Sequence, residues 1–178
     1  MMNIERVVLR FQQAVEVVNA DSPGGNAVHL ADDDTLEPLR AEFGDRIPEE
    51  ITQFFSHIRS VELPGAWKGY TIGPPEWIAE VHRSGRPAYV RQGGKTHEVM
   101  IVASNGAGVL YALELPYDGP VWVLPHSTIE DGVYDADTPE ALVYRPVGES
   151  FGYFVEQIAT YALVREDIDL FDPYKLRW

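Results

Sequence analysis

The hydrophobic residues near the start of the chain recur at the spacing of an amphipathic helix. Charged residues separate its apolar positions, which are Val7, Phe11, Ala14, Val15 and Val18. The pattern stops before residues 21–25, where Asp, Ser, Pro and two Gly residues form a strong helix-breaking run. The sequence therefore predicts an N-terminal helix followed by a loop.

Two further helices are predicted in the first third of the chain. One covers residues 36–43, with Thr35 as its N-cap, Pro38 in its first turn and Gly44 at its end. The other opens at Pro48, and the two glutamates that follow favour the positive end of a helix. Its apolar face is predicted to consist of Ile51, Phe54, Phe55 and Ile58.

From residue 67 onward the pattern changes to period two and to short apolar runs, which are typical of strands. A short helix is expected at residues 76–82, and Asn-Gly-Ala-Gly at 105–108 is a hairpin signal. Residues 142–144 are either a strand or an extended link. The predicted strands are 67–72, 88–91 at an edge of the sheet, 99–103, 109–115 and 121–124.

The chain ends in a predicted helix and a tail. Ser150 is the expected N-cap, and the buried stripe is Phe151, Phe154, Val155, Ile158 and Ala162. Helices, then consecutive strands, then a helix predict an α+β domain, with a mainly antiparallel sheet and helices packed against it. We divide the chain into an N-terminal helix and acidic loop (1–34), a main domain (35–164) and a C-terminal tail (165–178).

The balance of charged residues indicates which kinds of partner the chain can bind. The chain has 14 Lys and Arg against 28 Asp and Glu, a formal net charge of −14. Such a surface repels phosphates, so direct binding of nucleic acid is not expected. It attracts basic proteins and speeds encounter with them, although solubility alone also explains an acidic surface.

The composition also bears on the cellular compartment in which the protein is expected. The chain contains no cysteine, which excludes disulfides and thiolate chemistry. Glu5, Arg6, Arg10 and Glu16 lie within the first 20 residues, where a signal peptide would be apolar. No apolar run approaches the roughly 20 residues that span a bilayer. We therefore expect a cytoplasmic protein that does not enter a membrane.

The sequence contains no complete catalytic motif among those considered. Gly93-Gly94-Lys95-Thr96 resembles the end of a phosphate-binding loop, but that motif needs Gly where this chain has Tyr89. There is no Gly-x-Ser-x-Gly elbow, and the five histidines show no helical metal-binding spacing. No catalytic, cofactor-binding or metal-binding residue is therefore predicted, and the chain is expected not to be an enzyme. An enzyme whose cleft leaves no motif is the weakest alternative.

Three groups of residues are candidates for contact with a protein partner. The run Asp32, Asp33 and Asp34 is the densest acidic feature, although a solvated loop that favours the start of the following helix is its more ordinary explanation. Exposed aromatic residues are natural interface anchors, while some aromatics must belong to the core. The remaining candidates are Trp67, Tyr70, Trp77, Glu114, Tyr117 and Asp118.

The order of these elements resembles the SUKH superfamily, the Smi–Knr cell-wall-regulator-like family. The resemblance covers roughly residues 36–162. It consists of a helix ending in Gly44, Ile47-Pro48 opening a second helix, an aromatic strand leading into Pro75-Glu76-Trp77, the hairpin around residues 101–113, and Ser150-Phe151 opening the last helix. All of these motifs are structural, so their order and spacing carry the resemblance.

The resemblance implies a SUKH-like fold and a binding function. Bacterial members are largely immunity proteins, so it implies a protein that neutralises a cognate toxin, such as a basic nuclease domain, by binding it. The alternative is a cytoplasmic regulatory or adaptor protein of the same fold without a toxin partner.

Overall fold

A branched, ten-stranded sheet organises the computed structural model, which describes residues 2–66, 69–141 and 144–164. Its main part is antiparallel, and its strands follow one another as β1 (Ala27–Leu30), β2 (Ile58–Leu63), β3 (Tyr70–Ile72), β5 (Lys95–Asn105), β6 (Leu110–Glu114), β7 (Val121–Leu124) and β10 (Arg145–Gly148). The predicted α+β class with a mainly antiparallel sheet is confirmed.

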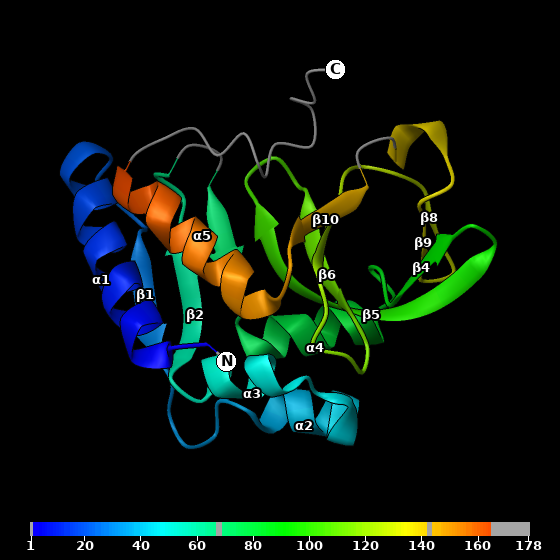
Figure 1. Ribbon diagram of the computed structural model, residues 1–178, viewed down its shortest axis with the longest axis horizontal. Helices are drawn as coiled ribbons and strands as arrows, with labels where there is room; N and C mark the ends of the chain where they lie inside the picture. Colours follow the sequence, from blue (N-terminus) through cyan, green and yellow to red (C-terminus); the bar gives the residue numbers. More distant parts are fainter. Residues whose placement is uncertain (1, 67–68, 142–143, 165–178) are drawn as a thin grey trace.

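The sheet branches because β5 is long enough to pair with different strands along its length. Its second half pairs with β3, while its first half pairs with β4 (Tyr89–Gln92). Beyond β4 lie β9 (Val133–Asp135) and β8 (Ile129–Glu130), and β4–β9 is a parallel pair. These short strands form an arm beside the main sheet (Figure 1).

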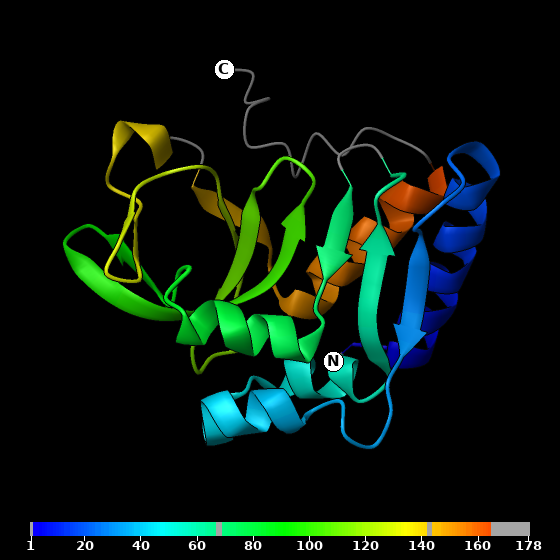
Figure 2. The ribbon, with the colours of Figure 1, turned by 180° about the vertical axis from the view of Figure 1, so that it is seen from behind.

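Helices cover one face and one end of the main sheet. α1 (Ile4–Asp21) and α5 (Phe151–Val164) lie side by side across one face, as both ribbon views show (Figures 1 and 2). α2 (Glu37–Phe43), α3 (Glu49–Phe55) and α4 (Pro75–Arg83) lie along the lower edge in Figure 1, with a 3-10 turn (Gly44–Arg46) after α2. A second such turn (Pro139–Ala141) precedes β10.

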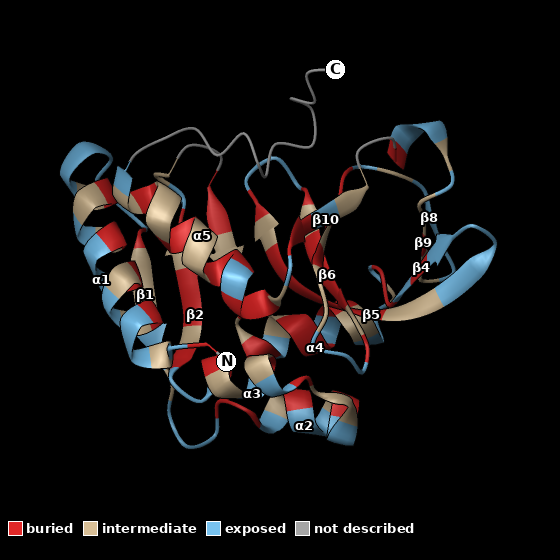
Figure 3. Ribbon diagram, in the orientation of Figure 1, coloured by how far each residue is buried: buried red, intermediate tan, exposed pale blue. Residues whose placement is uncertain are grey.

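The core has two parts because β5 and β6 bury both of their faces. Met100 and Val102 of β5 pack into the large cluster under α1 and α5, whereas Val99 and Ile101 pack into a second cluster with Val81 and Tyr134. The buried positions run along the central strands and the inner stripes of the helices (Figure 3). This double burial explains why residues 99–103 of β5 form a continuous apolar run.

Several sequence predictions need correction. Thr35 is not the N-cap of α2, because its hydroxyl bonds to Asp32 in the preceding turn and Leu36 takes the cap position. Ile58 belongs to β2 rather than to the face of α3, which ends at Phe55. The strand at residues 88–91 is not an edge, since β4 lies between β5 and β9.

The expected N-cap of the last helix can be compared with the structure, whereas two other predicted segments cannot. The Ser150 hydroxyl accepts the backbone N–H of Tyr153 at 3.3 Å, and the Ser150 carbonyl accepts the N–H of Phe154 at 3.0 Å. Both bonds are expected of an N-cap. The tail at 165–178 and residues 142–143 of the alternative strand or link lie outside the described residues.

Candidate binding surface

The acidic run lies on the surface between β1 and α2. Asp32, Asp33 and Asp34 are all exposed. The Thr35 hydroxyl donates to Asp32 Oδ1 at 2.6 Å and lowers the pKa of that carboxyl. Partial desolvation opposes this lowering, and the charge of Arg59 adds to it. Asp32 therefore shapes the turn, and its two neighbours project their charge into solvent.

A shallow depression of about 580 Å³ lies next to this run. Three carboxylates rim it, Asp34, Glu37 and Glu76, and the apolar atoms of Pro38 and Ala41 contribute to its lining. They come from the turn before α2, from α2 itself and from the first turn of α4. The helix starts thus bring Glu76 next to Asp34 and Glu37, from which it is distant in the sequence, around an apolar surface.

Arg59 of β2 is the one cation among the described residues that line this depression. Its guanidinium donates to Glu76 Oε1 at 2.5 Å and lies 3.9 Å from Asp32 Oδ2. Asp34 and Glu37 therefore keep an excess of negative charge at the rim, although Glu37 also meets Arg40 at 3.1 Å on the exposed side of α2.

The aromatic candidates do not join the acidic run. Tyr70 is only 2% exposed and its ring lies 6.3 Å from that of Tyr111, so it belongs to the core and offers no contact surface. The alternation along β3 turns Tyr70 inward together with Ile72. Trp77 is partly buried against both core clusters, and Trp67 lies outside the described residues.

The remaining candidates lie at the β6–β7 connection. Tyr117 is 66% exposed. Glu114 is partly exposed, and its carboxylate lies 2.7 Å from Nδ1 of His97 on the neighbouring strand β5. Asp118 accepts the backbone N–H groups of Glu49 at 3.1 Å and Glu50 at 3.2 Å. Of these three, Tyr117 offers the most accessible surface, while Asp118 is occupied in capping α3.

We expect Asp118→Ala to lower the free energy of unfolding by about 1 kcal/mol, because two N–H groups at the start of α3 lose their acceptor. Chemical denaturation measures the change. Asp33→Ala, which removes another exposed carboxylate without a capping role, is the matched control and should change stability by less than about 0.5 kcal/mol. Equal effects of the two substitutions would contradict the capping role.

A charged cluster that sequence patterns do not reveal surrounds His82 on α4. Its Nδ1 lies 2.7 Å from Glu42 Oε1 and its Nε2 lies 3.1 Å from Glu98 Oε1. Arg83 also contacts Glu42, and Arg46 contacts Glu98. Since carboxylates only accept hydrogen bonds, both contacts are satisfied together when both ring nitrogens carry a proton.

The cluster ties α2 to α4 and β5. Partial burial acts to raise the pKa of Glu98, but the hydrogen bond and charge of Arg46, together with His82, leave that pKa below its usual value of 4.5. The His82 ring also packs edge-on against Phe43, with ring centroids 4.7 Å apart. These contacts join elements that are distant in the sequence, so we assign the cluster a role in packing.

Two properties of the described residues bear on other kinds of site. Across residues 2–66, 69–141 and 144–164, no group of His, Asp and Glu side chains is arranged to hold a metal ion. No helix in the same ranges has the length and apolar character needed to cross a membrane.

A scan of the chain against models of protein families finds no match, and searches of curated proteins and of solved structures find none either.

Proposed function

We propose that this chain is a non-enzymatic binding protein that neutralises a basic protein toxin by covering its active surface. The observation that carries the proposal is the depression beside Asp34, where three carboxylates surround apolar lining atoms. The SUKH-like order of motifs supports the same function, since bacterial members of that superfamily are largely immunity proteins.

The electrostatics suit a basic partner. A net charge of −14 accelerates encounter with a positively charged surface, and acidic residues at the point of contact orient the partner. Toxins that cleave nucleic acid carry Lys and Arg in their substrate groove, because phosphate binding requires them. An acidic protein that occupies such a groove would exclude the substrate.

The apolar lining matters as much as the charge. Lys and Arg side chains carry long aliphatic stems, which need an apolar surface when their charged ends form ion pairs. Pro38 and Ala41 offer that surface within the same depression as Asp34 and Glu37. The depression is therefore suited to basic side chains rather than to anionic or purely apolar ligands.

The direct test is neutralisation. Co-expression of this chain with the protein encoded next to its gene should restore growth to cells that the neighbour alone kills, and the two purified proteins should form a complex. A neighbour that is neither toxic nor bound would overturn the proposal. Recovery of a housekeeping protein in its place would favour the regulatory or adaptor alternative.

Charge reversal at the rim tests the surface itself. We expect Asp34→Lys to weaken the complex about tenfold, mainly through slower association at low salt, because a like charge then faces the basic partner. Glu16→Lys changes the net charge equally at an exposed position on α1 and serves as the control. Stopped-flow or surface-based association rates measure both, and equal loss in the two variants would show that only the net charge matters.

A further inference from the structure

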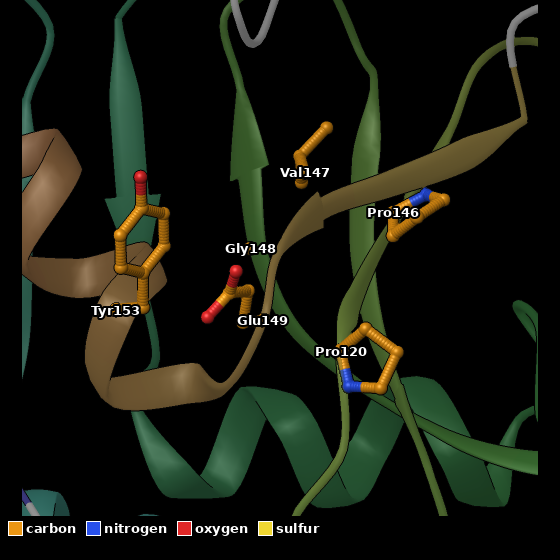
Figure 4. A pocket seen from close by; sticks show the side chains of 6 residues that line it. All are labelled: Pro120, Pro146, Val147, Gly148, Glu149 and Tyr153. Atoms are coloured by element: carbon orange, nitrogen blue, oxygen red, sulfur yellow. The ribbon is translucent and has the colours of Figure 1, made fainter.

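A second hollow lies at the junction of β10 and α5. It measures about 370 Å³ and is formed by the residues just before β7, by β10 and by the first turn of α5 (Figure 4). The lining residues are Pro120, Pro146, Val147, Gly148, Glu149 and Tyr153.

The local backbone explains why this hollow stays open. Within the described residues β10 pairs with β7 alone, and Pro146 lacks the N–H that a further strand would need. At Gly148 an added Cβ would lie 3.1 Å from Cβ of Phe154, so the strand passes close to α5 with no side chain of its own. The hollow is therefore bordered by prolines and a glycine that neither extend the sheet nor fill the space.

Its chemistry combines apolar walls, one aromatic ring and one carboxylate. Tyr153 is 46% exposed. Glu149 is the only charged residue that lines the hollow, and its exposed carboxylate has no ion-pair partner among the described residues. Arg145, at the other end of β10, does not line it. Among the residues that the structure describes, the hollow thus has no cation of its own.

We propose that this hollow receives an arginine side chain from a basic partner protein. The planar guanidinium can lie over the Tyr153 ring while it pairs with Glu149, and its aliphatic stem can pack against Pro120 and Pro146 (Figure 4). A second copy of this chain is a poorer occupant, because each copy carries a charge of −14 and would bring another Glu149 carboxylate to the same contact.

The inference rests on the proposed function only for the source of the arginine. It adds a contact point to the acidic depression beside Asp34, with a different chemistry. In the depression the charges form a rim of three carboxylates, whereas here a single carboxylate and a ring define the position and plane of one group.

A short peptide tests the hollow without any toxin. The probe is acetyl-Gly-Arg-Gly-amide, titrated into the full chain labelled with ¹⁵N, and the control is the same peptide with citrulline, which keeps the planar shape but has no charge. We expect saturable shifts of the amides of Gly148, Glu149 and Tyr153 with the arginine peptide, with an affinity on the order of millimolar. The citrulline peptide should bind at least about threefold more weakly.

Two exposed substitutions sharpen the result. Tyr153→Leu and Glu149→Gln should each weaken binding of the arginine peptide by roughly two- to fivefold, since a cation–π contact and an exposed ion pair are each worth that much. Unchanged amide spectra elsewhere would show that both variants are folded.

Shifts that spare Gly148, Glu149 and Tyr153, or that are equal for both peptides, would overturn the proposal. Neutralisation of a toxin without peptide binding here would leave the proposed function standing and remove this contact.

Discussion

Replacing Phe54 with alanine is expected to lower the free energy of unfolding by about 3–5 kcal/mol, the largest effect of any substitution proposed for this chain. Phe54 is completely buried in α3, and its ring meets those of Phe11, Phe55 and Phe151 edge-on, with centroids 5.1–6.5 Å apart. Truncation leaves a cavity at the point where α1, α3 and α5 meet. Because the neighbouring rings are held by their own helices, the cavity should close only in part.

Urea denaturation followed by circular dichroism measures this loss. Tyr117→Ala is the matched control, because it removes an aromatic ring that is 66% exposed, and it should change stability by less than about 0.5 kcal/mol. A loss below about 1 kcal/mol for Phe54→Ala would mean that the three helices do not share one rigid core.

The second large effect is expected at His82. Substitution by alanine should cost about 2–3 kcal/mol, because Glu42 and Glu98 each lose a hydrogen bond in a region where their side chains are only 16% and 25% exposed. Arg46 and Arg83 remain to offset part of that charge. Arg83→Ala is the control: its side chain is 60% exposed, so its loss should cost no more than about 1 kcal/mol.

The dependence on pH gives an independent check of the His82 cluster. The pKa of Glu98 is lowered in the folded chain, so the stability it contributes is present above its usual pKa of 4.5 and is lost as the pH falls through the lower folded value. His82 is one cause of that lowering. The difference in unfolding free energy between the wild-type chain and His82→Ala should therefore shrink as the pH is lowered below 4.5. A difference that stays constant down to the acid transition would exclude this linkage.

The fold was predictable wherever one face of an element is buried. α1, α4 and α5 show clear apolar stripes, and the hairpin of β5 and β6 is marked by its turn. The sequence did not predict β1 or β2. Arg59 and Glu62 interrupt the apolar positions of β2, and half of the residues of β1 are exposed. β8 and β9 have two and three residues, too few to show a period.

The candidate surfaces were predictable only in part. The exposure of the run at Asp32 follows from its charge, since three adjacent carboxylates are costly to bury. The burial of Tyr70 depends on which face of β3 meets the large core cluster, and the apolar and polar positions of a three-residue strand do not decide it. The His82 cluster draws on α2, α4, β5 and a 3-10 turn, so no local spacing could indicate it.

The pairing of α1 with α5 has a consequence for synthesis on the ribosome. Arg10 of α1 donates to Thr160 of α5 at 2.9 Å, and the two helices share the face of the sheet where Phe11 is buried. At ribosomal rates of about 5–20 residues per second, α5 emerges on the order of ten seconds after α1. Throughout that interval the apolar stripe of the nascent α1 has no α5 to cover it, so chaperones that bind exposed apolar segments would find their target near the start of this chain.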